Sequence, residues 1–510
     1  MLKQDLLTKD EKINRSDALV YVEERDFDLA AVLMRLGEFG PYYRRMLIST
    51  VTLLTLINSC FILMPFVFLQ PTFYCKAADG AISLCNQVKA CNNEFGYETR
   101  APYLSVIIKQ KIYCDKRWMQ ETGQSIIFFG SSLLSMIFCF VFNKIGRLPL
   151  FKVSFGLSIV FSLILLVSDN YWLIVCCFTI FFTIYFNTFN NFYVYTTEVF
   201  LGKWKSIATS LLIFGVGVTK LLCIGLYYIF PDYYTCFILF TLINLSIVPL
   251  CYYFVETPFF LYNKGDIDGL RKNLKYINKE NNKSDIELIT QNDLYIDTMI
   301  DSIPEKKESG VIEKSGKSDL IQLSIHIIII ALCIIPHYFL LGLVETIPAK
   351  LGINNVYLSS ILFAITTTFT CLPMNFVLHK IPRRNGSIFF NGISFLVCMC
   401  FLFFSSKQAQ ESFVSDWIQM ILALIAFGLG YVEFLILCRY VSEVFPIQHR
   451  ITSIVIIMAI GRNGSVFAGY IDELSEKLDI HTFVFVGITY LLILPLLFFF
   501  KETINNKSSD

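Results

Sequence analysis

The sequence predicts an all-α polytopic membrane protein with twelve transmembrane helices, arranged as two parallel repeats of six. Three observations support this fold class. Hydrophobic residues make up 55% of the 510 positions and charged residues only 16%, whereas about a quarter of the residues of a soluble domain are charged. Apolar runs long enough to cross a bilayer recur along the chain. Motifs of the first half of the chain also return in the second half.

Twelve apolar segments are expected to cross the membrane as helices, because hydrocarbon offers no partner to an exposed backbone N–H or C=O group. They are 46–69, 124–142, 150–167, 171–194, 206–229, 234–254, 320–344, 356–378, 386–404, 417–438, 451–471 and 482–500. They divide the chain into an N-terminal segment (1–45), a first half (46–254) with a long loop at 70–123, a linker (255–319), a second half (320–500) and a tail (501–510). In the linker, an amphipathic helix is expected from Asp266 to Lys279, and the stretch from Asp301 to Lys317 is expected to be disordered.

Lysine and arginine predict the orientation. Most of them fall on the side of the N-terminus, while the short loops on the other side hold only Lys350, Lys407 and Lys477. Basic residues concentrate in cytoplasmic segments, so both termini and the linker are expected inside the cell. The first 45 residues are too polar for a signal peptide, and the first span is expected to act as a signal anchor. The formal net charge of +1 offers no basic surface to nucleic acid.

Four of the 16 cysteines lie in the long outside loop, at positions 75, 85, 91 and 114. The other twelve lie in the spans, where a thiol is a small apolar filler. Four thiols in an oxidising compartment predict two disulfides, with three possible connectivities. A zinc site is the competing interpretation, although the spacing fits no compact zinc finger.

Three pairs of motifs indicate an internal duplication. Glu198-Val199-Phe200 with Lys205 returns as Glu443-Val444-Phe445 with Arg450, 245 positions later. Glu256-Thr257 returns as Glu502-Thr503, 246 positions later. The run from Asn143 to Arg147 returns as the run from His379 to Arg384, 236 positions later. A parallel repeat joined by a cytoplasmic linker is the plan of the major facilitator fold, whose substrate site lies at mid-membrane between the halves.

From about residue 27 to 503 the chain resembles the organic cation/anion transporters, solute carrier family 22. The resemblance rests on the long cysteine-bearing first loop and on CDKRWMQETGQSIIFFG at 114–130, VYTTEVFLGKWKSIATSLLIFGVGV at 194–218, VETPFFLYNKGDIDGLRKNLKYI at 255–277 and SEVFPIQHRITS at 442–453. Sugar porters share the fold but lack so long a first loop. The resemblance implies a transporter of small organic ions in the plasma membrane.

The chain also departs from the family. Cys139 and Asn143 stand where the signature after the second span has Gly and Asp, and Leu148-Pro149 replace its final arginines. In the second half, Asn375, His379 and Pro382 stand at the Gly, Asp and Gly positions, while Arg383-Arg384 are kept. In the family this acidic residue helps to lock the cytoplasmic side, so its absence implies a weaker or rewired gate. The outside loop has no N-x-[ST] glycosylation sequence, which family members usually carry.

Three charged residues fall deep within spans, where a charge costs about 2.5–3.5 kcal/mol on insertion scales and therefore needs a reason. They are Arg462, Glu433 and Lys220, each roughly 15–22 Å from the cytoplasmic interface at about 1.5 Å per residue. Their sum predicts an excess of about one positive charge in the cavity, which favours an organic anion or zwitterion. The family position of Arg462 resembles one that is acidic in cation carriers and arginine in anion carriers. A purely structural Arg462–Glu433 pair is the alternative.

Aromatic and amide side chains in the fourth and tenth spans are expected to line the substrate path. The candidates are Asn187, Tyr193, Tyr431 and Phe434, because an aromatic wall with a few amides suits flat amphipathic ions. His326 and His337 in the seventh span are interpreted as interior imidazoles rather than proton relays.

The charged residues at the cytoplasmic helix ends are expected to form the gate. Glu198 and Glu443 should pair there with basic residues such as Arg147, Arg383 and Arg384, beside the repeated Lys205 and Arg450.

The sequence therefore predicts a facilitative carrier or exchanger that works as a monomer by alternating access. No phosphate-binding glycine loop supports ATP-driven pumping, no enzymatic motif is evident, and no cofactor or metal is expected. The alternative is a transporter-like protein that has lost transport and serves as a receptor or scaffold.

Overall fold

The computed structural model describes residues 29–37, 39–76, 82–85, 90–93, 96–250, 254–283, 285–301, 303, 317–343, 356–377, 380–404, 413–445, 447–478 and 480–503. Within these ranges a helix lies at each of the twelve expected spans. The first six are α2 (Pro41–Val67), α5 (Arg117–Ile145), α6 (Arg147–Val167), α7 (Tyr171–Val199), α8 (Gly202–Ile229) and α9 (Tyr233–Leu250). The second six are α13 (Lys317–Leu343), α15 (Val356–Val377), α16 (Arg383–Met399) continued by η4 (Cys400–Phe404), α17 (Phe413–Val444), α18 (Ile447–Gly461) continued by α19 (Asn463–Leu478), and α20 (Thr482–Leu497).

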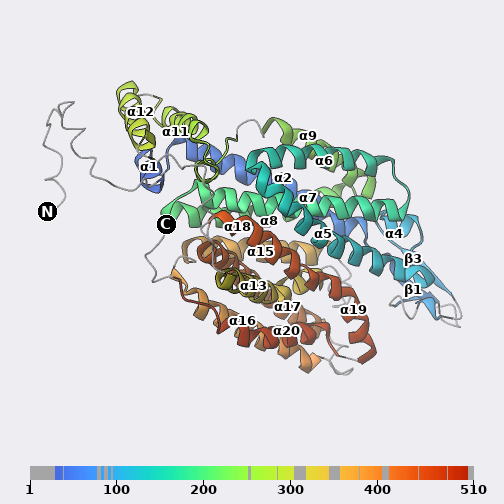
Figure 1. The fold of residues 1–510 in the computed structure, drawn as a ribbon. Coiled ribbons are helices and arrows are strands. Elements are labelled where there is room, and N and C mark those ends of the chain that lie inside the picture. Colours follow the sequence, from blue (N-terminus) through green and yellow to red (C-terminus); the bar gives the residue numbers. More distant parts are fainter. Residues whose placement is uncertain are drawn as a thin grey trace, which may run out of the picture.

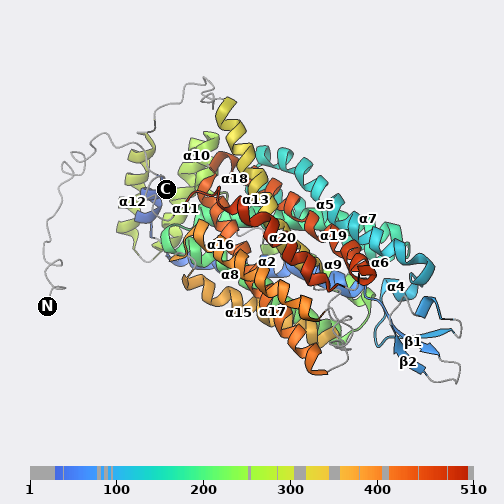
Figure 2. The same cartoon turned by 90° about the horizontal axis from the view of Figure 1, so that it is seen from below.

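The twelve helices form two bundles that lie side by side. Helices α2 and α5–α9 make one bundle, and α13, α15–α17 and α18–α20 make the other (Figure 1). Most helices run along one common direction, as the view turned by 90° also shows (Figure 2). The predicted division into two halves of six is therefore confirmed, together with the all-α membrane fold.

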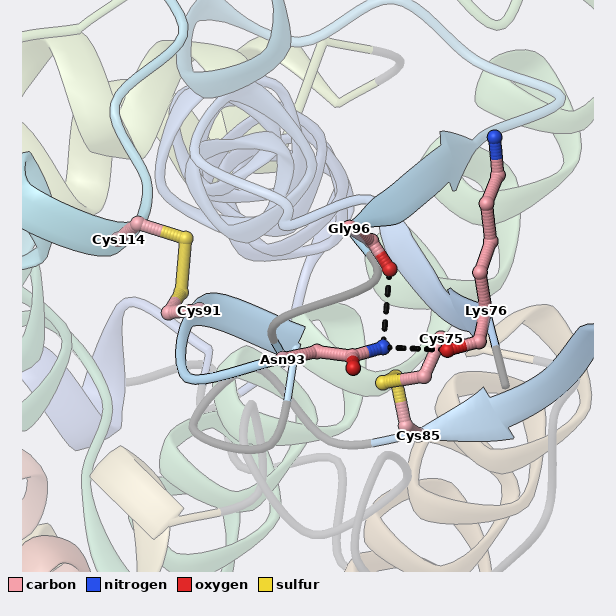
Figure 3. Close-up of a disulfide and its surroundings, with 7 residues drawn as sticks. All are labelled: Cys75, Lys76, Cys85, Cys91, Asn93, Gly96 and Cys114. Atoms are coloured by element: carbon pink, nitrogen blue, oxygen red, sulfur yellow. Dashed lines mark hydrogen bonds between the residues drawn. A yellow bond between two sulfur atoms is a disulfide. The ribbon is translucent and has the colours of Figure 1, made fainter. Parts of the chain in front are cut away.

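The long loop after α2 folds into a small sheet that the sequence did not predict. Its strands β1 (Thr72–Lys76), β2 (Ile82–Cys85) and β3 (Tyr97–Arg100) pair antiparallel in the order β2-β1-β3. One disulfide joins Cys75 to Cys85 and a second joins Cys91 to Cys114 (Figure 3). Close to them, the Asn93 amide donates to two backbone carbonyls across the loop, at 2.9 Å each. Pairing of all four loop cysteines selects one of the three connectivities and leaves none of these four thiols for a zinc site in the loop.

The loop continues through α4 (Val106–Lys109) and the short η1 (Cys114–Lys116) into α5. Backbone hydrogen bonds tie it to the α8–α9 turn: the N–H of Leu104 donates to Pro231 at 2.8 Å, and the N–H of Tyr233 donates to Leu104 at 3.1 Å. The sheet therefore sits on the end of the first half rather than hanging free of it.

The described residues of the linker form three helices where the sequence predicted one. They are α10 (Pro258–Lys264), α11 (Ile267–Asn281) and α12 (Ile286–Asp301). Thr257 caps α10, Gly265 ends it at a φ of +79°, and Asp266 caps α11, which are the side chains and the left-handed glycine that such boundaries favour. Most of the stretch expected to be disordered, Asp301 to Lys317, lies outside the described residues.

The linker helices dock on the start of the first half. The Asn281 amide accepts from the N–H of Tyr42 at 3.0 Å and donates to the carbonyl of Leu36 at 2.8 Å. The Arg35 guanidinium of α1 (Leu29–Arg35) lies 3.9 Å from the ring centre of Tyr295 in α12. These helices lie at the opposite end of the bundles from the sheet (Figure 1).

Candidate functional site

The two halves meet along helices that approach at backbone distance. Helix α8 packs on α15, and α5 packs on α18 and α19. A Cβ on Gly217 of α8 would lie 2.4 Å from the hydroxyl oxygen of Thr368 in α15. Glycine therefore permits this contact, as small residues do between membrane helices. The candidate site is built on helices that line this interface.

The eleventh span is broken at Arg462, between α18 and α19. Here the N–H of Ser465 donates to the carbonyl of Arg462, three residues back, at 3.0 Å. Such a tight turn interrupts the regular α-helical spacing. On either side, Gly461 and Gly464 face α13, and a Cβ on Gly464 would lie 2.3 Å from the carbonyl oxygen of Ile335. Because glycine has no side chain, the broken span can pack closely against α13 at these two positions. This close packing determines where the Arg462 side chain is placed.

The Arg462 side chain is fully buried and only partly bonded. Its Nε donates to the carbonyl of Met458 at 3.1 Å, and its guanidinium carbon lies 3.9 Å from the ring centre of Phe186 in α7. Its exposed fraction is 0%, and neither terminal nitrogen has a hydrogen-bond partner within the described part of the chain. A buried charge is costly unless it is paired. The two free ends of the fork are therefore suited to an anionic group from outside the protein.

Helix α7 adds unpaired amides close in sequence to Phe186. Asn187 is 3% exposed, and both atoms of its amide lack a partner among the described residues. Asn190, one turn after Phe186, is 2% exposed, and its amide nitrogen likewise has no partner in the described ranges. Buried amides are normally hydrogen-bonded, so these groups also suit a polar ligand.

A second cation, Lys220, lies in a cluster of aromatic side chains that joins the two halves. The ammonium of Lys220 in α8 donates to the hydroxyl of Tyr431 in α17 at 3.4 Å and lies 5.4 Å from the ring centre of Phe427. His337 of α13 stacks on Phe434 at 4.4 Å and meets Tyr431 edge-on at 4.9 Å. Three of the predicted substrate residues, Lys220, Tyr431 and Phe434, thus belong to one group of side chains.

Glu433 lies apart from this group. It accepts a hydrogen bond from the Asn391 amide of α16 at 3.1 Å and is 3% exposed. At about 100° per residue, Glu433 points roughly opposite to Tyr431 on α17. No ion pair joins it to Arg462 among the described residues. The structural pair that the sequence left open as an alternative is not formed.

A charged network closes the end of the second half near the linker. The carboxylate of Glu443 accepts from Nε and Nη2 of Arg383 at 3.0 and 2.9 Å, and from Nε of Arg439 at 2.9 Å. The Thr503 hydroxyl donates to it at 2.6 Å. Glu502 accepts from the backbone N–H of Arg383 at 2.8 Å, at the start of α16. The network joins α16, α17 and the segment after α20, all within one half.

The first half repeats this network at the predicted offsets. The Thr257 hydroxyl donates to Glu198 at 2.6 Å, as Thr503 does to Glu443. Glu256 accepts from the N–H of Leu148 at 3.1 Å, at the start of α6, as Glu502 does at the start of α16. The duplication inferred from short motifs is therefore visible in the hydrogen bonds.

Arg384 and Arg450 lie beside the second-half network. The backbone N–H of Arg384 donates to Glu502 at 3.3 Å, while its guanidinium lies 5.9 Å from the ring centre of Phe498 rather than at Glu443. Arg450 is 9% exposed and donates to the carbonyl of Phe445 at 3.4 Å.

The remaining predicted residues belong to the first half. Arg147 opens α6 at the position that corresponds to Arg383, and its side chain is outside the described part. Lys205 lies in the first turn of α8. Tyr193 of α7 lies beside Arg439 and Ser442 of α17, so it contacts the other half near the charged network rather than near Arg462.

An aromatic contact joins the halves at the end nearest the sheet. Tyr357, at the start of α15, packs edge-on against Tyr228 at 5.3 Å, and lies 6.2 Å from Tyr227 and 6.5 Å from Phe66. Tyr103 of the disulfide-bonded loop lies close to it as well. One side chain of the second half is thus inserted among aromatic residues of the first half.

The sequence pointed to Phe186 only as one of several aromatic residues in the fourth span, and it did not point to Asn391 or Tyr357. Aromatic residues are so frequent in this chain that no periodic signal marks Phe186 or Tyr357. Asn391 had a signal, because buried polar residues recur at four- and three-residue spacing along α16. The sequence showed the Glu-Thr pairs as a repeat but not what they do. In the structure each glutamate accepts from a backbone N–H at the start of a helix, and each threonine donates to a second glutamate.

Comparison with known proteins identifies the family. The model of the family "Sugar (and other) transporter" matches residues 115–508. The chain belongs to this family, within the major facilitator superfamily. The family consists of transporters, not enzymes. The chain is 22% identical over 411 residues to solute carrier family 22 member 16 of Xenopus laevis and 25% identical over 319 residues to an organic cation transporter protein of Drosophila melanogaster.

These matches cover 76% and 54% of this chain, and 66% and 56% of the two relatives, which is less than two thirds of their lengths. Among solved structures, the proton:xylose symporter XylE aligns over 93% of this chain and 97% of its own with a TM-score of 0.59 and 13% identity. The human organic anion transporter MFSD10 aligns over 89% and 99% with a TM-score of 0.58 and 11% identity. At these identities the structural similarity shows the major facilitator fold but not the substrate. The substrate class must be inferred from the residues of this chain.

Proposed function

We propose that this chain carries small organic anions or zwitterions across the plasma membrane by alternating access, with both termini in the cytoplasm. The observation that supports this most is Arg462, a fully buried guanidinium at the interface of the halves with two unpaired terminal nitrogens. A carboxylate or sulfonate accepts two parallel hydrogen bonds from such a fork. A neutral sugar would leave its charge uncompensated.

The balance of charge also favours an anion. Arg462 and Lys220 both lie where the halves meet, while Glu433 faces Asn391 on the other side of α17. An anion about 4 Å from a single cation gains roughly 4 kcal/mol at an effective dielectric constant of 20, and an organic cation loses as much. The cluster of Tyr431 and Phe434 offers an apolar wall to the body of the substrate.

Alternating access requires each half to move as one piece. The networks around Glu198 and Glu443 lie within their own halves and hold the helix ends together. The contacts between halves are the ones that must open: Tyr193 against α17 toward the cytoplasm, and Tyr357 against Tyr228 toward the outside. The charged networks stabilise the moving bodies, and the aromatic contacts act as gates.

The test is uptake by proteoliposomes that contain the purified full chain. Naphthalene-1-sulfonate serves as a fluorescent anionic probe, tetraethylammonium as a cation, glycine betaine as a zwitterion and glucose as a neutral sugar. Competition by carboxylates, sulfonates or betaine, with no effect of tetraethylammonium or glucose, is the expected result. Inhibition by the cation alone would reverse the proposed charge preference.

The second candidate is a membrane receptor or scaffold that no longer transports. It is favoured by Asn143 and His379, which stand where the family signature has aspartates. Such a protein would bind the anionic probe without moving it. Probe-induced thermal stabilisation of the purified chain, with neither uptake nor exchange in liposomes, would support this function.

A further inference from the structure

The second half contains a buried polar cluster that the proposed substrate site does not use. Along α16, Ser387, Asn391 and Ser394 recur at helical spacing, and each has an exposed fraction of 0%. The hydroxyl of Ser387 and the amide oxygen of Asn391 have no hydrogen-bond partner within the described residues. Glu433 of α17 meets this stripe through the Asn391 amide at 3.1 Å.

Helices from every side enclose Glu433 without offering a positive charge. Asn391 faces it from α16, Cys333 from α13 and Tyr490 from α20. On its own helix the next charged residue is Arg439, which bonds to Glu443. No ion pair of Glu433 occurs in the described part of the chain, and α15 and α18 present no charged group to it there. A carboxylate in this setting must be neutralised by something that enters from outside.

We infer that Glu433 takes up and releases the proton that drives transport, so that the protein is a proton–anion symporter. This inference rests on the proposed function and adds its driving force. The Asn391 amide nitrogen donates to the carboxylate at 3.1 Å, so the group that meets Glu433 there is a hydrogen-bond donor and not an oxygen ligand of a metal cation. A proton needs only the carboxyl oxygen. The polar stripe from Asn391 to Ser387 runs toward the start of α16, the end expected in the cytoplasm, and gives the proton a route of release to that side.

The position of Glu433 explains how the proton and the substrate are linked. Tyr431 precedes it by two residues and Phe434 follows it directly on α17, and both belong to the aromatic cluster around His337. The closed packing around Glu433 requires the neutral carboxylic acid. An ionised carboxylate favours a looser packing that admits water. The change of packing moves α17, and with it the aromatic side chains of Tyr431 and Phe434. By reciprocity, a substrate that stabilises the closed wall favours uptake of the proton.

One proton from the outside binds Glu433 with each anion and leaves to the cytoplasmic side with it, and the carboxylate then returns empty. One proton and one monovalent anion carry no net charge together. A gradient of one pH unit, acidic outside, therefore supports about tenfold accumulation of the anion. The membrane potential has no effect on this accumulation.

Proteoliposomes with naphthalene-1-sulfonate test this, because a sulfonate stays ionised and does not cross the bilayer as a neutral acid. The wild-type chain should accumulate the probe about tenfold per pH unit, unaffected by a potential clamped with potassium and valinomycin. In Glu433→Gln, which keeps the shape and stays neutral, accumulation should be lost while exchange of labelled for unlabelled probe persists. Glu98→Gln in the outside loop is the matched control and should behave as wild type.

Each other outcome separates the inference from the proposed function. Exchange that is intact in the wild type but indifferent to a pH gradient overturns the proton coupling and leaves the anion carrier standing. Accumulation that follows a sodium gradient, or that persists in Glu433→Gln, also overturns it. Absence of both uptake and exchange in the wild type refutes the carrier itself.

Discussion

Replacement of Arg462 by methionine distinguishes a substrate-binding arginine from a structural one. The guanidinium is fully buried, donates only through Nε to the protein, and keeps both terminal nitrogens unpaired within the described residues. If these nitrogens hold the substrate anion, the loss is one charge-assisted, two-point contact. Hydrogen bonds to charged groups contribute about 1.5–3 kcal/mol each, and the whole charge interaction about 4 kcal/mol. We therefore expect the anion affinity to fall about 100- to 1,000-fold.

The stability of the empty protein should change in the opposite sense. A buried guanidinium without a counter-ion is a cost to the fold, and methionine fills similar space beside Phe186 without it. The melting temperature of empty Arg462→Met in detergent should equal or exceed that of the wild type, while the shift caused by naphthalene-1-sulfonate disappears. Arg462→Lys is the matched control: it keeps the charge, loses the fork, and should bind with intermediate affinity.

The assay combines probe uptake at equal protein level with thermal melting of the same preparations. A methionine variant that melts several degrees lower and still transports with unchanged affinity would show that Arg462 stabilises the bundle. That result would refute the reasoning from the unpaired nitrogens, because a stabilising arginine must have a partner in the fold.

Three further predictions concern the ends of the bundles. Tyr357→Ala should loosen the outer aromatic contact and speed the alkylation of buried Cys223 by an impermeant maleimide several-fold, whereas an unchanged rate would place the outer gate elsewhere. Glu443→Gln leaves the guanidinium of Arg383 buried without its carboxylate and should cost about 3 kcal/mol of stability; the melting temperature should fall, and a swap of the two charges should restore part of it. Thiol labelling of the denatured, non-reduced chain should leave the four cysteines of the outside loop unmodified, and recovery of them as free thiols would contradict both disulfides.

The sequence predicted the spans because a bilayer leaves one solution for an apolar run of that length. It also located the duplicated networks, since Glu443 and Glu198 recur at a fixed offset from their neighbours. It did not predict the sheet around Cys75, whose strands are short and polar, nor helix α12. The alternative of an Arg462–Glu433 pair rested on the similar depth of the two residues in the membrane, counted along their helices. Depth along a helix says nothing about which face a side chain takes, and a difference of two residues on α17 turns Glu433 away from the interface.

The two halves share their networks but differ at the groups that perform the proposed chemistry. Glu198 and Glu443 each accept from a threonine of a returning Glu-Thr pair, so both halves inherit the same rigid end. The residues at the positions of Arg462 and Glu433 in the first half, 245 positions earlier, are Gly217 and Thr188. Gly217 is the point at which α8 meets α15, and Thr188 bonds to its own helix. The repeated networks around Glu198 and Glu443 therefore support the movement of the halves. The residues without a counterpart in the first half, Arg462 and Glu433, bind the anion and the proton. Loss of Glu433 should consequently leave the motion and exchange intact, whereas loss of a network glutamate should weaken both.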